Sequence, residues 1–157
     1  MGSPTESYKR LYGAVKTNDT YAIKQLLTKR TVDMETMAAK RAGKSLDDML
    51  AAGGTDTTYA ETMPTIRDER IRDNMAAIEV WDGKANTWDD LPYIFEDGAW
   101  KLALGDELAG AYRSPGPGRA VREAQAANSA GASSPTPSSS LPGRSPLRRI
   151  PSGTMLQ

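Results

Sequence analysis

The first half of the chain carries apolar residues at the spacing of amphipathic helices. The first apolar stripe follows the i, i+3, i+4, i+7 rule and consists of Tyr8, Leu11, Tyr12 and Val15. Ser3-Pro4 precedes this stripe, and a capping serine followed by proline is typical of the first turn of a helix. Further helices are predicted at residues 20–29 and at residues 31–42, where Gly43 can end the helix. Another is predicted after Ser45, which is expected to cap it, with Gly53-Gly54 ending it.

Beyond Pro64 the spacing of the apolar residues changes from that of a helix to the alternation of a strand. Residues 67–73 are mostly charged, which is typical of an edge strand. Alternation over residues 76–81 predicts a second strand. A third strand is predicted at residues 88–96, where Pro92 indicates a bulge or an edge position because proline cannot donate to the ladder.

The stretch FEDGAWKLAL, residues 95–104, has the pattern of a hairpin. Asp97-Gly98 is a strong two-residue turn signal, because a type I′ turn needs positive φ at both central positions. The strand after the turn is predicted to place Trp100, Leu102 and Leu104 on one face. Helices followed by antiparallel strands predict an α+β fold, with N-terminal helices packed on a curved, cone-like antiparallel sheet.

The composition changes at Ser114, where a segment rich in Ser, Pro, Gly and Ala begins. Such a segment buries too little apolar surface to offset its ordering entropy. We therefore expect one α+β domain over residues 4–113 and a disordered basic tail over residues 114–157. Residues 119–128 have helical propensity, but an isolated helix of that length is marginal in water.

The net charge of zero hides an asymmetry between the two parts of the chain. Residues 1–112 hold 14 Lys and Arg against 19 Asp and Glu, whereas residues 113–157 hold 6 Arg against 1 Glu. The tail arginines are dispersed, so we interpret them as part of a disordered tail and not as a site for acidic partners. An acidic domain also argues against nucleic-acid binding, which needs a positive surface.

The chain contains no cysteine and no histidine. This excludes disulfides, thiol nucleophiles, Ser-His-Asp triads and the usual zinc sites within the chain, and we expect no metal and no cofactor. No run of 18 apolar residues predicts a transmembrane helix. The first ten residues lack the apolar core of a signal peptide, and the sequence does not say whether a signal peptide or lipid anchor was removed.

One carboxylate is a weak candidate for catalysis. Glu79 is predicted mid-strand, on the same side as Trp81. Inside a cavity its pKa would rise and it could act as a base. On a solvated face it would pair with Lys101 or with an arginine across the sheet, which is the interpretation we favour. The adjacent acidic pairs are expected to be structural, and they are Asp47-Asp48, Asp68-Glu69, Asp89-Asp90 and Glu96-Asp97.

Aromatic side chains cluster in the predicted strands, where they can form a core or line a pocket. Trp100 alternates with Leu102 and is expected in the core. Trp81, Tyr93 and Tyr59 are the candidates for a ligand pocket or an interface. Aromatics on both faces of one sheet would need cover, which a homodimer through the outer sheet face could supply.

Three stretches together resemble the nuclear-transport-factor-2-like superfamily, namely SPTESYKRLYGAVKTNDTYAIKQLL, RIRDNMAAIEV and EDGAWKLAL. The similarity covers residues 4–113 and is greatest to small bacterial domains of unknown function found on exported lipoproteins. It implies a cone-shaped α+β fold with a cavity between helices and sheet, and an exported or periplasmic location. The superfamily's enzymes, ketosteroid isomerases and polyketide cyclases, place acidic residues and tyrosines in that cavity. Its non-enzymes use the cone to bind partners, so the fold alone does not determine function.

These observations lead us to expect a non-enzymatic accessory or binding module of unknown ligand. The alternative is a small enzyme or apolar-ligand carrier, with Glu79 as base and Tyr59 or Tyr93 as hydrogen-bond donor in the cone cavity. A third hypothesis is a structural homodimer through the outer sheet face. A buried Glu79 beside an open cavity would favour the enzyme, whereas exposed Trp81 and Tyr93 would favour the interaction module.

Overall fold

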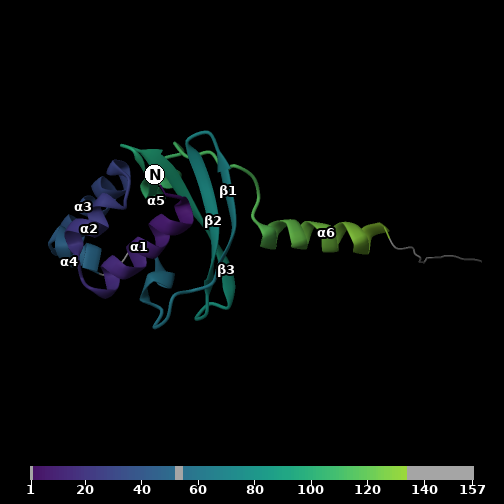
Figure 1. Ribbon diagram of the computed structural model, residues 1–157, viewed down its shortest axis with the longest axis horizontal. Coiled ribbons are helices and arrows are strands. Elements are labelled where there is room, and N and C mark those ends of the chain that lie inside the picture. Colours follow the sequence, from purple (N-terminus) through teal and green to yellow (C-terminus); the bar gives the residue numbers. More distant parts are fainter. Residues whose placement is uncertain (1, 52–54, 134–157) are drawn as a thin grey trace, which may run out of the picture. The chain divides into compact units, whose positions relative to one another are not determined.

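The computed structural model describes residues 2–51 and 55–133 (Figure 1). These residues form two compact units, one ending at Gly118 and the other beginning at Arg119. The glycine stop predicted at residues 53–54 and the tail residues 134–157 lie outside the described residues. The elements are α1 (Pro4–Lys16), α2 (Thr20–Gln25), α3 (Lys29–Ala42), α4 (Leu46–Ala51), the 3-10 helix η1 (Asp56–Tyr59), β1 (Ile66–Arg72), β2 (Met75–Asp82), β3 (Thr87–Glu96), β4 (Ala99–Leu102), α5 (Leu104–Leu108) and α6 (Arg119–Ser133).

The predicted helix caps are confirmed. The Ser3 hydroxyl accepts a hydrogen bond from the Glu6 N–H at 3.2 Å at the start of α1. The Ser45 hydroxyl accepts one from the Asp48 N–H at 3.1 Å at the start of α4. α3 ends at Gly43, whose φ of 67° is left-handed, a conformation that glycine adopts without steric cost.

The helix predicted at residues 20–29 is shorter in the structure, because the chain leaves α2 to meet the sheet. Leu27 forms a parallel bridge with Leu102. The Leu102 N–H donates to the Leu26 carbonyl at 2.9 Å, and the Thr28 N–H donates to the Leu102 carbonyl at 3.0 Å. Thr28 then caps α3. The apolar period runs through this break, so the sequence pattern does not reveal it.

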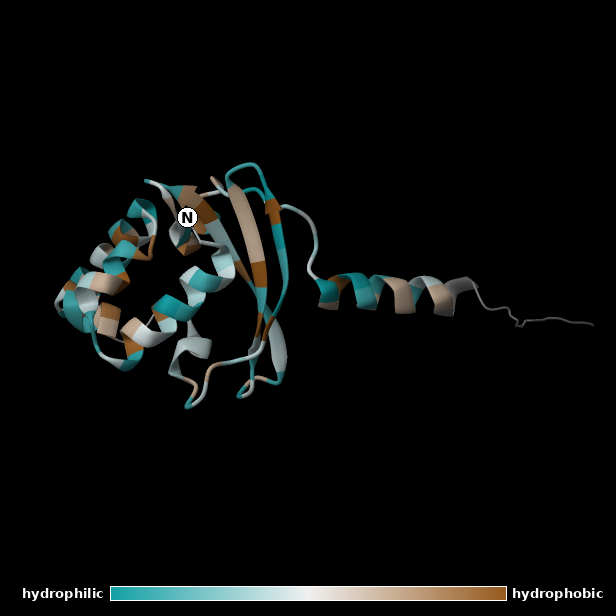
Figure 2. Ribbon diagram, viewed as in Figure 1, coloured by the Kyte–Doolittle hydropathy of each residue, from teal (hydrophilic) through white to brown (hydrophobic). Residues whose placement is uncertain are grey.

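The fold is α+β, as predicted, with the N-terminal helices packed against a four-stranded antiparallel sheet of order β1-β2-β3-β4 (Figure 1). α1 lies against β1, β2 and β4. We call this side of the sheet the helix face and the opposite side the outer face. β1 is the predicted charged edge strand, and Figure 2 shows it mostly in hydrophilic colours beside the more apolar β2.

The predicted hairpin between β3 and β4 is confirmed. Asp97 and Gly98 have φ values of 52° and 80°, which are the two positive values of a type I′ turn. Phe95 and Trp100 are paired across this hairpin and pack edge to face with ring centroids 5.3 Å apart. The turn therefore fixes the register that places Trp100 in the core.

The prediction that Leu104 continues the strand is wrong, because β4 ends at Leu102 and the chain turns into α5. α5 packs against the first turn of α3. A Cβ on Gly105 would lie 2.6 Å from the Arg30 carbonyl oxygen, and the Gly105 N–H donates to the Thr31 hydroxyl at 3.0 Å. This close approach needs glycine and draws the chain away from the sheet.

The register between β2 and β3 shows which side chains share a face. Tyr93 is opposite Ala76 on the helix face, whereas Trp81 is opposite Trp88 on the outer face. Tyr93 is only 1% exposed. The prediction that Tyr93 joins Trp81 in an outer interface is therefore wrong. Alternation shows which residues of one strand share a face of the sheet. Only the register shows which residues of two neighbouring strands share a face.

The prediction of a bulge or an edge position at Pro92 is wrong, because β3 is an interior strand between β2 and β4. The β2–β3 register runs past it without a shift, and its carbonyl accepts from the Ala103 N–H at 2.9 Å where β4 ends. The irregularity lies in β1 instead, between Arg67 and Arg70. Asp68 has a φ of 54° there, as in bulges that aim neighbouring side chains.

One core lies between the helices and the helix face of the sheet. Its largest fully buried apolar side chains come from α1, α2, α4 and the sheet, and they are Tyr8, Leu11, Ile23, Leu50, Ile78, Val80, Tyr93 and Leu102. The N-terminal helices are thus held by the burial of their apolar stripes, which contributes roughly 1.5–3 kcal/mol for each large side chain.

The structure differs from the predicted tail at the C-terminal end of the described residues. Residues 114–118 belong to the first unit, beyond the boundary at residue 113 that composition suggests. Residues 119–133 form the helix α6, so the expectation of a disordered tail is wrong for this part, and the stretch with helical propensity extends beyond residue 128. Within the described residues, no helix is long and apolar enough to cross a membrane.

Candidate functional site

Glu79, the weak catalytic candidate, is a buried partner of Arg67. The Arg67 Nε lies 2.7 Å from the Glu79 Oε1, and Glu79 is 2% exposed. The sequence favours a pair with Lys101 or with an arginine across the sheet. The partner is an arginine, and the expectation of Lys101 is wrong because Lys101 lies opposite Ile94 on β3. The expectation that this face is solvated at Glu79 is wrong.

The cover over Glu79 comes from the chain itself, through residues 112–118, which we call the strap. The Tyr112 hydroxyl donates to the Ala76 carbonyl at 2.8 Å. At the other end, Gly118 lies so close that a Cβ there would be 2.7 Å from the Glu79 Oε2. The strap thus provides, at this part of the outer face, the cover that a homodimer would otherwise supply.

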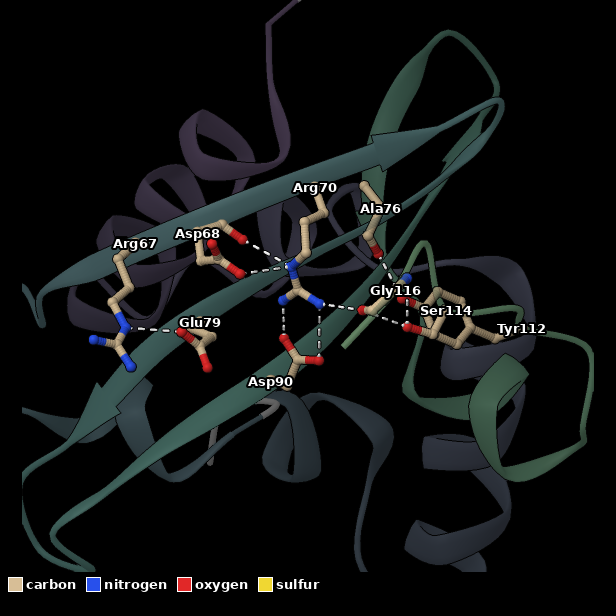
Figure 3. Close-up of polar contacts among 9 residues, drawn as sticks. All are labelled: Arg67, Asp68, Arg70, Ala76, Glu79, Asp90, Tyr112, Ser114 and Gly116. Carbon is tan, nitrogen blue, oxygen red and sulfur yellow. Dashed lines mark hydrogen bonds and ion pairs between the residues drawn. The ribbon is translucent and has the colours of Figure 1, made fainter. Parts of the chain in front are cut away.

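Arg70 ties the strap to the sheet (Figure 3). Its guanidinium forms an ion pair with Asp90 on β3 and donates to the Gly116 carbonyl of the strap at 2.5 Å. Its Nε also lies 3.0 Å from the Asp68 Oδ2, beside the β1 bulge. The Arg70 side chain therefore makes internal contacts and does not contribute to an exposed positive surface on β1.

The carboxylate and tyrosine of the enzyme alternative do not converge. Glu79 is on the outer face under the strap, and Tyr93 is on the helix face. Tyr59 belongs to η1, and the Glu79 carboxylate does not line the pocket where Tyr59 lies. A general base and its hydrogen-bond donor must reach one shared reacting group, and neither Tyr59 nor Tyr93 meets Glu79 at one pocket.

A surface pocket of about 400 Å³ lies between η1 and the end of β2. It brings together Trp81, which is half-buried, and Tyr59, which is 53% exposed. We call it the Trp81–Tyr59 pocket, and its volume is within the range of small-molecule sites, about 300–1,000 Å³. The remaining lining residues are Thr57, Ala60, Glu61, Asp82, Gly83 and Lys84.

The inner wall of the Trp81–Tyr59 pocket is fixed to α1. The Tyr8 hydroxyl donates to the Thr57 hydroxyl at 2.6 Å, and the Tyr12 hydroxyl donates to the Ala60 carbonyl at 2.5 Å. Burial raises the pKa of Tyr8 to about 12, so its hydroxyl stays protonated and able to donate at alkaline pH below that value. These bonds join η1 to the core, so this wall is preformed.

The opposite wall is fixed by the turn after β2. The Asp82 Oδ1 accepts from the Lys84 and Ala85 N–H groups at 3.0 and 3.1 Å. Trp81 is supported by Trp88, whose ring packs edge to face with centroids 5.1 Å apart. Trp81 is therefore held in place and needs little ordering on binding.

Tyr93, the third aromatic candidate, lies outside the Trp81–Tyr59 pocket. Its hydroxyl is buried and has no hydrogen-bond partner among the described residues. Burial, together with the nearby Tyr8, raises the pKa of Tyr93 well above its ordinary value. Such a hydroxyl carries a desolvation cost that no bond offsets.

Sequence patterns identified two residues of the pocket, Trp81 and Tyr59, but missed Thr57, Glu61 and Lys84. These residues lie in turns and short helices with no period, so nothing in the sequence shows that η1 faces the β2 turn. In the described part of the chain, no cluster of acidic side chains is placed to hold a metal ion.

Comparison of the chain with protein-family models, with curated proteins and with solved structures finds no match. The similarity to the nuclear-transport-factor-2-like superfamily therefore stays a prediction.

Proposed function

We propose that the first unit is a non-enzymatic binding module whose ligand occupies the Trp81–Tyr59 pocket. The observation that carries this proposal is the meeting of two accessible aromatic side chains, from η1 and β2, at one preformed pocket. Aromatic side chains offer a large contact area at low entropic cost, and they are enriched in binding sites. Bonds from α1 and the turn after β2 hold the two walls in position.

The enzyme or carrier alternative has less support. It needs Glu79 and a tyrosine in one cavity, but Glu79 is sealed by Gly118 and paired with Arg67. A structural homodimer through the outer face would have to accommodate the strap, which already contacts Ala76 and Glu79 there.

The wider assignments are proposals of the same kind. The α+β layout, with helices on one face of an antiparallel sheet, is compatible with a nuclear-transport-factor-2-like domain. An origin in an exported bacterial protein depends on that similarity alone.

A thermal-shift screen of a small-molecule fragment library tests the proposal on the full chain. A ligand that binds only the folded state raises the melting temperature by mass action. We expect some compounds to stabilise the wild type but not Tyr59→Ser. Tyr21→Ser is the matched control, because Tyr21 is also an exposed tyrosine, at 73%, and does not line this pocket.

The proposal is overturned if no compound stabilises the wild type. It is equally overturned if the stabilising compounds act on Tyr59→Ser as strongly as on the wild type. A response that is lost in Tyr21→Ser and kept in Tyr59→Ser would place the ligand in the pocket beside α2, which Tyr21 lines, and would also overturn it.

A further inference from the structure

The chemistry of the Trp81–Tyr59 pocket narrows the class of ligand. Besides the two aromatic rings, its lining contributes three charged side chains, Glu61, Asp82 and Lys84. The Asp82 Oδ1 already accepts two backbone N–H groups. Glu61 is exposed and makes no hydrogen bond or ion pair with the described residues, so its carboxylate is available to a ligand.

The charges of the pocket and of its unit favour a cation. Two acidic residues and one basic residue line the pocket, and the first unit, which ends at Gly118, holds 19 acidic against 15 basic side chains. Such a surface raises the local concentration of cations. Lys84 is the one lining group that would favour an anion, and it stands on an exposed turn.

Aromatic rings add a specific attraction for cations. The negative face of an indole or phenol ring attracts a positive charge within about 6 Å of its centroid. The same part of the sheet already contains one such contact, because the Arg67 guanidinium lies 3.8 Å from the centroid of Trp88. Trp88 in turn packs against Trp81.

We infer that the Trp81–Tyr59 pocket binds a methylated or quaternary ammonium group, held between the two rings and neutralised by Glu61. This inference rests on the proposed function, since it names the ligand class of the same pocket. The methyl groups match the apolar ring faces. The delocalised charge costs less to desolvate than a primary ammonium.

Choline and its uncharged isostere 3,3-dimethylbutanol test the inference, titrated into the full chain by calorimetry. The two probes have the same shape, so their difference isolates the charge. We expect choline to bind about 2- to 30-fold more tightly than the isostere, the ratio given by a cation–π contact of about 0.5–2 kcal/mol. Vesicles of phosphatidylcholine form a second arm, which distinguishes a lipid headgroup from a free small molecule.

Substitutions at two exposed positions should change the affinity in one direction if the ligand is a cation and in the other if it is an anion. Glu61→Gln should weaken choline binding about threefold or more and leave binding of 3,3-dimethylbutanol unchanged. Lys84→Gln should strengthen choline binding. Neither side chain makes a contact with the described residues that folding needs, so both variants should keep the wild-type melting temperature.

Each result is decisive for the ligand class. Equal affinity for choline and 3,3-dimethylbutanol overturns the ammonium assignment and leaves the binding module in place. Reversed effects of Glu61→Gln and Lys84→Gln overturn it in favour of an anion. If neither probe binds, the ammonium assignment also fails, and the separate fragment screen shows whether the pocket binds other compounds. Saturable binding of choline or of phosphatidylcholine vesicles that weakens about threefold or more in Glu61→Gln supports the inference and identifies the source.

Discussion

The Arg67 Nε and the Glu79 Oε1 lie 2.7 Å apart on the outer face of the sheet, under the strap. The Glu79 side chain is 2% exposed and the Arg67 side chain 19%. In an interior of low dielectric, removal of one member of such a pair leaves the charge of the other poorly compensated. The pair is therefore a structural element that links β1 to β2, and it gives a first prediction.

Glu79→Gln should lower the free energy of unfolding by about 3 kcal/mol, because breaking a buried ion pair costs that order of energy. Urea unfolding followed by circular dichroism measures the change. Asp47→Asn is the control, since Asp47 pairs with Lys24 at 3.3 Å with a side chain that is 62% exposed, and this should cost less than about 1 kcal/mol. Equal losses in the two variants would contradict the role of burial.

The strap gives a second prediction. A Cβ on Gly118 would lie 2.7 Å from the Glu79 Oε2 and 3.2 Å from its Cγ, so Gly118→Ala should destabilise the unit by about 1–3 kcal/mol through overpacking. Gly13→Ala is the matched control. Gly13 lies within α1 with no atom near the position of the added Cβ, so alanine should stabilise the unit by about 1 kcal/mol. An unchanged stability of Gly118→Ala would mean that the strap does not pack on Glu79.

The two buried tyrosines of the core should respond in opposite ways to loss of the hydroxyl. Tyr8→Phe removes the donor to Thr57 and should cost about 1 kcal/mol. Tyr93→Phe removes a hydroxyl without a partner among the described residues and should raise the free energy of unfolding by up to about 1 kcal/mol. The measurement is again urea unfolding. A clear loss in Tyr93→Phe would show that its hydroxyl is hydrogen-bonded in solution.

Alkaline pH gives a fourth prediction. Burial raises the pKa of Tyr8 from 10.0 to about 12, and it raises the pKa of Tyr93 and Tyr112 as well. The folded state thus favours the neutral phenol. Its contribution to stability is fully present below pH 10, the unfolded value, and is lost as the pH rises through the folded value.

Tyrosinate absorbance and far-ultraviolet circular dichroism, recorded together against pH, check this prediction. Ionisation of the buried tyrosines should coincide with loss of helical signal above about pH 11. Tyr93→Phe should move the midpoint of base-induced unfolding to higher pH. Ionisation of all six tyrosines while the fold remains intact would contradict the burial of these hydroxyls.

Local chemistry made part of this fold predictable. The caps at Ser3 and Ser45 and the Asp97-Gly98 turn depend on a few neighbouring residues, so the sequence predicts them directly. The face occupied by Tyr93 could not be predicted, because it depends on the β2–β3 register. Nor could the cover over Glu79, since a Pro/Gly-rich segment such as the strap has no period that shows where it packs.

The candidate site was predictable only in part, for the same reason. Trp81 and Tyr59 stand out as aromatic residues, but their meeting depends on how η1 packs against the end of β2. That packing is set by hydrogen bonds from Tyr8 and Tyr12 of α1, which are tertiary contacts. The charged residues of the pocket belong to turns, where sequence patterns do not distinguish a ligand group from a solvated one.

The most direct test of the central claim is ¹H–¹⁵N correlation NMR of the full chain, titrated with choline and with each compound that raises its melting temperature. If the Trp81–Tyr59 pocket is the binding site, the amide signals of residues 57–61 and 81–84 and the Trp81 indole N–H should shift together and saturate. The shifts should disappear in Tyr59→Ser. Saturable shifts confined to other parts of the chain, or none at all from a folded protein, would contradict the account.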